Sequence, residues 1–258
     1  YNVWCAIDFP SIISIFGRRG TGKSFTLGSF AEGLIGHGLD IRKGEENPAA
    51  ILFDTLGHFW QMEYPPPTTD EDQIKSLTDW GLNPQGFDNV EIYVPAGYDK
   101  HDDDWNFFTI QYSDLSLDDW CGMLKVDRFE TPQGRLMAQV FDKVTSTGWQ
   151  RGNWDADGNL ASQSTENSNA NYNVDMLCEC ALNDVDVNDE RIGYKMDTIR
   201  ALVSKLTAMG QWPVLHNTGT PLTELFRSGI LSIIKLSGVD DAEKQMIAGI
   251  IIKKIFFF

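Results

Sequence analysis

The 258-residue chain lacks the features on which secreted, zinc-binding and membrane-spanning proteins depend. It has four cysteines, Cys5, Cys121, Cys178 and Cys180, whose spacing gives neither a disulfide framework nor the C-x-x-C pattern of a zinc site. No apolar run approaches the roughly 18–20 residues of a membrane span, and no signal peptide is visible. We therefore expect no membrane partner and a reducing, cytoplasmic location.

Positive charge is also scarce, because 21 Lys and Arg residues stand against 37 Asp and Glu residues, for a net charge of −16. A protein that held DNA over its whole surface would repel the phosphate backbone with this balance. A local basic strip, or a ring with a basic lumen, is compatible with it. Charge therefore gives no basis for predicting nucleic-acid binding.

Histidine-based catalytic patterns are missing too, since the four histidines are scattered and no Ser/His/Asp arrangement is legible. The apolar content of 42%, with 8 Trp and 15 Phe, indicates a packed globule that holds one large domain or a core plus an insertion. The chain starts at Tyr1 and stops within a helical pattern, so we expect a fragment of a longer protein.

What the sequence does have is a short apolar run, residues 11–16, that leads directly into the pattern G-x-x-x-x-G-K-S. Glycines let the backbone wrap a polyphosphate with its N–H groups pointing inward. The run is typical of a buried strand, and residues 24–34 of an amphipathic helix whose positive N-terminal end faces the anion. The apolar side chains expected to pack from this helix are Phe25, Leu27, Phe30, Ala31 and Leu34.

This strand–loop–helix context predicts a nucleotide site with ATP and Mg²⁺ as cofactors. Lys23 is expected to reach the β/γ-phosphates and is the candidate catalytic residue, while Ser24 offers its hydroxyl to Mg²⁺. The arginines of the loop could meet phosphate or a neighbouring subunit, and we favour solvent for at least one of them. The residues expected to bind the nucleotide are Gly17, Arg18, Arg19, Gly20, Thr21, Gly22, Lys23, Ser24 and Phe25.

Asp54 ends a second apolar run, residues 49–54, and is the other candidate metal ligand. A carboxylate at the end of a strand beside the loop could hold Mg²⁺ through water, as a Walker B aspartate does. It could instead cap the turn formed by residues 55–57 or contact other groups of the nucleotide site. The next position is Thr55, so no acidic residue follows to activate water.

Further along the chain, the pattern predicts an α/β fold with a mostly parallel sheet and an inserted helical region. The expected helices are residues 70–80, 114–144, 194–210 and 240–258, and the expected strands are residues 90–94 and 230–236. Residues 149–173 are rich in Asn, Asp, Gly and Ser and are typical of a loop. The predicted division is 1–112 for the first part of the core, 113–212 for the insertion and 213–258 for the rest of the core.

Two acidic stretches partly match calcium-binding loops. Asp155, Asp157, Asn159 and Glu166 have the spacing of oxygen ligands, but Leu160 stands where the sharp turn needs glycine. The run Asp184-x-Asp186-x-Asn188 departs from the pattern in a similar way. We expect solvated acidic loops at both places.

With these pieces in order, the chain resembles the HerA/FtsK branch of P-loop ATPases, in particular the HerA-like proteins of archaea and their viruses. The stretches that carry the resemblance are residues 15–24, 51–57, 197–212 and 229–238 with the helix after it. The resemblance implies a RecA-like core, assembly as a hexameric ring, and ATP hydrolysis that moves duplex DNA or supports DNA-end processing with a partner nuclease.

The resemblance also implies residue roles. The phosphate role falls on Gly17, Gly20, Gly22 and Lys23 and the Mg²⁺ role on Ser24, whereas Asp54 matches the acidic residue after the second strand and not Walker B. The Walker B pair with its water-polarising glutamate is expected beyond Phe258, so this chain is expected to bind nucleotide without hydrolysing it. The trans-acting arginine and the N-terminal β-barrel of the family are also missing. Lys235 stands where many relatives have an acidic residue, and its role stays open.

Other functions use the same loop. A nucleotide-dependent switch or a small-molecule phosphotransferase is the alternative to a DNA motor, and a scaffold whose interface is stabilised by nucleotide is a third reading.

Overall fold

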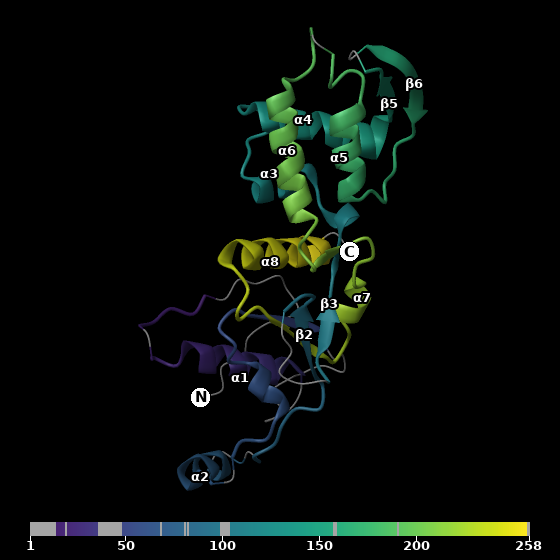
Figure 1. The fold of residues 1–258 in the computed structure, drawn as a ribbon. Helices are drawn as coiled ribbons and strands as arrows, with labels where there is room; N and C mark the ends of the chain where they lie inside the picture. Colours follow the sequence, from purple (N-terminus) through teal and green to yellow (C-terminus); the bar gives the residue numbers. More distant parts are fainter. Residues whose placement is uncertain are drawn as a thin grey trace.

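A parallel four-stranded sheet forms the centre of the lower part of the molecule in Figure 1, with strand order β1-β8-β2-β3. The structure is a computed structural model and describes residues 14–18, 20–35, 48–67, 69–79, 81, 83–98, 104–156, 159–189 and 191–256. The strands are β1 (Ala50–Asp54), β2 (Val90–Pro95), β3 (Asn106–Phe108) and β8 (Leu231–Lys235). The expected α/β class with a mostly parallel sheet is confirmed.

Each face of this sheet is covered by helix, which is why its central strand β8 is buried at all five positions. Helix α1 (Lys23–Ile35) contributes Ala31 and Ile35 to a cluster with Leu52, Ile92 and Ile233 on one face. On the other face, α8 (Asp241–Phe256) packs Ile247, Ile250 and Ile251 into a cluster with Ile234 and Leu236. Successive side chains of a strand point to opposite faces, so β8 serves both clusters.

The middle of the chain forms a separate group of helices at the opposite end of the molecule from α2, with α8 between this group and the sheet (Figure 1). The helices are α3 (Leu117–Leu124), α4 (Pro132–Asp142), α5 (Val174–Asn183) and α6 (Met196–Met209). A turn of π-helix, Lys143–Thr147, follows α4 and leads into a hairpin of β5 (Trp149–Trp154) and β6 (Leu160–Glu166). Inside the group, Trp120 Nε1 donates to Tyr172 Oη and Tyr172 Oη to the Leu115 carbonyl, each at 2.8 Å.

Shorter elements connect the two parts. A small parallel sheet pairs β4 (Ile110–Gln111) with β7 (Leu215–His216). The remaining elements are the 3₁₀ turns Trp60–Glu63 and Tyr112–Asp114 and the helices α2 (Glu71–Asp79) and α7 (Leu222–Leu225). None of the helices in the described ranges is long and apolar enough to cross a membrane.

The predicted elements agree with the structure wherever a long periodic pattern has clear end signals. The start of α3 is an example, because Ser116 Oγ accepts from Asp119 N and the Asp119 carboxylate accepts from Ser116 N at 2.7 Å. The single helix expected over residues 114–144 is wrong, since the chain leaves the helix at Lys125 and starts α4 again at Pro132. Thr131 Oγ1 caps that second start by accepting from Gly134 N at 3.0 Å.

Two further predictions about local structure fail. The loop expected over residues 149–173 is largely the β5–β6 hairpin, whose turn is closed by Asn159 N donating to Asp155 Oδ1 at 2.8 Å. Of the strand expected over residues 11–16, residues 14–16 lie in no strand and residues 11–13 lie outside the described residues. From α1, the side chains of Phe25, Leu27 and Phe30 are exposed instead of packed.

Replacing Lys125 by glycine should stabilise the protein. Lys125 is exposed and has a left-handed backbone with φ of 53°, a conformation that costs a residue with a Cβ atom about 1 kcal/mol relative to glycine. Urea denaturation should show a gain of that size for Lys125→Gly and almost none for Lys125→Ala, which keeps the Cβ atom. Equal stability of all three proteins would contradict the cost assigned to this backbone.

Candidate nucleotide site

The glycine-rich loop makes a tight turn before α1. Gly20 and Gly22 have φ angles of 83° and 82°, a left-handed conformation that L side chains rarely adopt. The carbonyl of Arg18 accepts from Thr21 N at 3.3 Å and from Thr21 Oγ1 at 2.8 Å. A Cβ atom on Gly17 would lie 2.4 Å from Thr21 Oγ1, so a side chain at this position would force Thr21 to shift. Arg19 lies outside the described residues.

Lys23 is the first residue of α1, and its ammonium group folds back over the loop. Its Nζ donates to the Arg18 carbonyl at 2.7 Å. The rest of the loop is open, because Arg18, Ser24 and Phe25 are exposed. The loop therefore offers backbone groups, one lysine and one hydroxyl to an incoming anion without first having to unpack from the core.

The contacts of α1 fix the edge of the sheet at which this loop lies. At the C-terminal end of α1, the Ile35 carbonyl accepts from Asn89 Nδ2 at 3.0 Å, and the same amide donates to the Gly229 carbonyl at 2.8 Å. Asn89 and Gly229 precede β2 and β8, so α1 ends at the N-terminal edge of the strands and begins at their C-terminal edge. Open parallel sheets bind their ligands at that C-terminal edge.

Asp54, at the C-terminal end of β1, organises the next loop at this edge. Its side chain is 1% exposed; Oδ1 accepts from Gly57 N at 2.7 Å and His58 N at 3.0 Å, and Oδ2 accepts from Phe59 N at 2.8 Å. The Phe59 ring then lies against α1, 3.6 Å from where a Cβ atom of Gly28 would be. These contacts are the ones expected if Asp54 caps the turn. A role of Asp54 in metal binding stays a prediction.

Lys235 lies beside Asp54, since the two residues are partners in the parallel pairing of β1 with β8. The lysine is 6% exposed, and its Nζ is 5.6 Å from the centroid of the Trp105 ring. Burial lowers the pKa of Lys235, and the charge of Asp54 partly opposes that shift. The sequence left the role of Lys235 open because only the pairing of distant strands places it at this edge.

The acidic stretches that partly match calcium loops have other contacts. Glu166 pairs with Arg151 Nε at 2.9 Å, Asp155 closes the hairpin turn, and Asp157 lies outside the described residues. Within the ranges that the structure covers, no group of three or more His, Cys, Asp or Glu side chains is placed to hold a metal ion.

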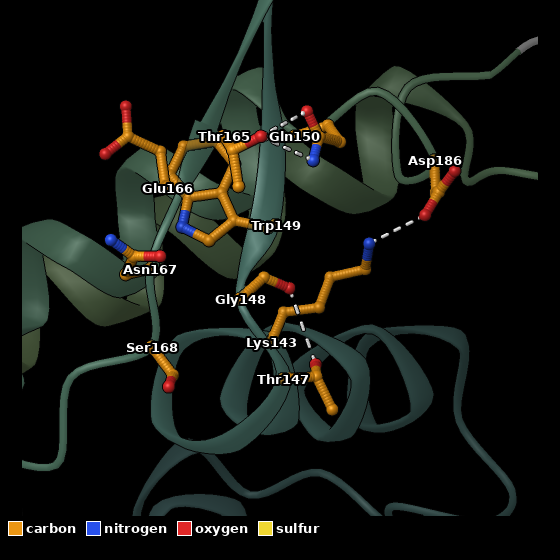
Figure 2. Close-up of a pocket in the computed structure, with 10 residues that line it drawn as sticks. All are labelled: Lys143, Thr147, Gly148, Trp149, Gln150, Thr165, Glu166, Asn167, Ser168 and Asp186. Atoms are coloured by element: carbon orange, nitrogen blue, oxygen red, sulfur yellow. Dashed lines mark hydrogen bonds and ion pairs between the residues drawn. The ribbon is translucent and has the colours of Figure 1, made fainter.

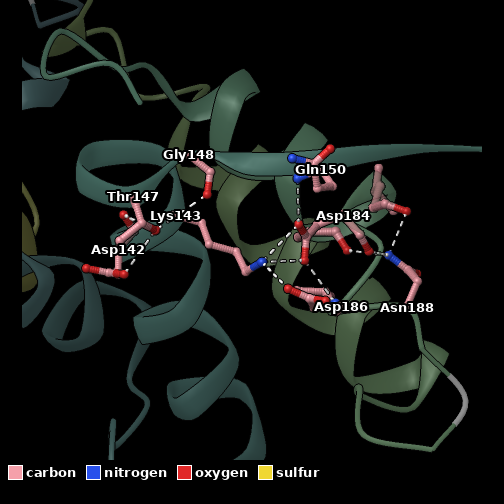
Figure 3. Close-up of polar contacts among 11 residues, drawn as sticks. Asp142, Lys143, Thr147, Gly148, Gln150, Asp184, Asp186 and Asn188 are labelled. Carbon is pink, nitrogen blue, oxygen red and sulfur yellow. Dashed lines mark hydrogen bonds and ion pairs between the residues drawn. The ribbon is translucent and has the colours of Figure 1, made fainter. Parts of the chain in front are cut away.

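Asp184 is not the solvated residue expected from the sequence, because it is fully buried (Figure 3). Its carboxylate accepts from Lys143 Nζ at 3.0 Å and from the backbone N–H groups of Gln150 and Val187. Asp186 binds the same ammonium group at 2.7 Å. This network ties the end of α4 to the segment after α5, so its role is structural.

A hollow of about 280 Å³ lies beside this network, at the base of the β5–β6 hairpin. Figure 2 shows the residues that line it. Its charged groups are already paired, Lys143 with the two aspartates and Glu166 with Arg151. The charged side chains that line the hollow are therefore not free to act as an acid or a base.

A glycine-rich loop and lysine at the start of a helix, placed at the C-terminal edge of a parallel sheet, define a P-loop nucleotide-binding protein. Residues 7–255 match the family described as Helicase HerA, central domain, and the chain belongs to that family. The protein is thus a P-loop ATPase of the HerA/FtsK class with a RecA-like fold, a class that uses nucleotide with Mg²⁺. A comparison with curated proteins finds no match.

Removing the Asp54 carboxylate should destabilise the protein, because three backbone N–H groups would lose their acceptor. For Asp54→Ala we expect a loss of about 2–4 kcal/mol in the free energy of unfolding. Asp54→Asn keeps one acceptor oxygen and should lose less. Urea denaturation of the three proteins measures both values, and an unchanged midpoint for Asp54→Ala would show that the turn does not depend on this side chain.

Proposed function

We propose that this chain binds ATP with Mg²⁺ at the loop around Lys23, and that the full-length protein, as a homo-oligomeric ring, drives the movement of duplex DNA. The observation that carries the nucleotide part is the open loop with two left-handed glycines at the start of α1. The exposure of Arg18, Ser24 and Phe25 leaves this loop accessible to a polyphosphate. Family membership supports the ATPase class.

Backbone groups, the Lys23 ammonium group and the Ser24 hydroxyl each have a different part in binding. The backbone of Gly17, Gly20 and Gly22 surrounds the phosphates, and Lys23 exchanges the Arg18 carbonyl for a phosphate oxygen. The Ser24 hydroxyl holds Mg²⁺, which supplies electrostatic stabilisation of the charge on the phosphates when it is bound. Asp54 keeps the adjoining turn in place and is a further candidate for contact with the metal through water.

We assign DNA contact to the lumen of the ring. A net charge of −16 would repel DNA from the surface as a whole, but it is compatible with a basic lumen. We assign the nucleotide site to residues 1–112 and 213–258 and regard residues 113–212 as an inserted helical domain, supported by the grouping of α3 to α6 on the far side of α8 from the sheet. This group shares one apolar cluster with β8 and α8, so it packs directly on the core. On α6, Arg200 is exposed and available to a polyanion, whereas Lys205 is held by the Leu124 carbonyl and Gln133. A partner nuclease is a further expectation for DNA-end processing.

Lys23→Ala should abolish most ATP binding. Charge-assisted contacts are worth about 1.5–3 kcal/mol each, and this lysine is expected to make more than one, so we expect affinity to fall by at least about a hundredfold. Isothermal titration with Mg²⁺–ATP measures the change. Lys75→Met, on the exposed surface of α2, removes the same charge away from the loop and should bind like the parent. Unchanged affinity of Lys23→Ala would refute the nucleotide site.

Binding of the full-length protein to duplex DNA should weaken steeply with salt. Each phosphate contact is expected to contribute about −0.9 to the slope of log affinity against log salt concentration. Fluorescence anisotropy with a labelled duplex, from low to physiological salt, measures the slope. A flat response would argue against a DNA motor and in favour of a nucleotide-dependent switch.

A further inference from the structure

Lys235 lies on the face of the sheet that α1 covers, because successive side chains of β8 point to opposite faces. Leu231 and Ile233 lie in the cluster that contains Ala31 and Ile35 of α1. Two residues further along the same strand, Lys235 is the next side chain on that face. It ends the strand, so it lies at the C-terminal edge, where α1 begins.

Lys23 and Lys235 lie at similar positions along the direction of the strands. Asn89 binds the carbonyls of both Ile35 and Gly229, which places the end of α1 and the start of β8 together. From Ile35 back to Lys23 the helix rises about 18 Å, and from Gly229 to Lys235 an extended chain rises at most about 20 Å. Lys23 and Lys235 therefore lie at a similar level at the C-terminal edge of the sheet.

Lys235 is buried without a counter-charge bonded to it. In the part of the chain that the structure describes, it makes no hydrogen bond and no ion pair, and only the Trp105 ring lies under its ammonium group. The oxygens of the neighbouring Asp54 are occupied by the N–H groups of its own turn. Because the Asp54 oxygens are engaged with their own turn, the largely buried Lys235 would gain from a further anion at this edge.

We propose that Lys235 is a second phosphate-binding lysine, which contacts the terminal phosphate of a nucleoside triphosphate held by the loop around Lys23. The inference rests on the proposed nucleotide site and adds to it a preference for nucleoside triphosphates. The loop backbone surrounds the inner phosphates and Lys23 reaches the β- and γ-phosphates, so a cation that comes from the sheet would add a second positive charge at the outermost phosphate. Lys235 then favours a triphosphate over a diphosphate.

The test compares Lys235→Met with the parent protein in titrations with ATP and with ADP. Methionine keeps the length and apolar stem of the side chain and removes its charge. We expect affinity for ATP to fall about tenfold, the value of one contact to a charged group, and affinity for ADP to change much less. The melting temperature without nucleotide should stay the same or rise, because a buried unpaired charge is lost. Lys75→Met is the control for net charge.

The outcomes separate this inference from the function on which it rests. If Lys23→Ala loses ATP while Lys235→Met binds ATP and ADP like the parent, the nucleotide site stands and the role of Lys235 is refuted. An equal loss of both nucleotides would also refute it. Lys235→Gln repeats the test with a polar side chain; lower melting temperatures in both variants would assign Lys235 a structural role instead. Parent-like binding by Lys23→Ala would refute the nucleotide site itself.

Discussion

The pairing of β8 between β1 and β2 is the constraint on which the rest of the structure depends. This strand comes from residues 231–235, far along the chain from both of its neighbours, and all five of its residues are buried. At its start Leu231 N donates to the Asn89 carbonyl, and after its end Leu236 N donates to the Asp54 carbonyl. Without it, β1 and β2 would have no common sheet, and α1 and α8 would lose the two faces that they cover.

The same pairing assembles the polar edge of the sheet. It sets Lys235 beside Asp54, and the loop after β8 brings Ser237 against the turn at Gly57, where a Cβ atom would lie 2.8 Å from Ser237 Oγ. The Asp54 carboxylate holds that turn, and Phe59 of the turn packs on α1. Helix α1, which follows the glycine-rich loop, is thus joined to the sheet through the turn of Asp54, so the position of the proposed nucleotide site depends on a residue that need not contact the nucleotide.

Local signals in the sequence predicted some elements well and others poorly, for reasons that the contacts explain. The apolar runs of β1, β2 and β8 were sufficient, because burial acts over a few residues. The β5–β6 hairpin was missed because β6 is a polar strand, exposed at all but its last position, with no apolar alternation to mark it. Asp184 looked like a surface residue because Lys143, its partner, is 41 residues away.

By itself, the sequence determined that this is a nucleotide-binding α/β protein, because the glycines, lysine and serine of the loop are contiguous and their backbone requirements are local. It also determined the family, through stretches spread over nearly the whole chain. Only the tertiary structure decided that Asp54 is fully engaged with its own turn and that Lys235 is a buried cation at the same edge as Lys23. Strand order and register bring such residues together, and a pattern read along the chain contains neither the strand order nor the register.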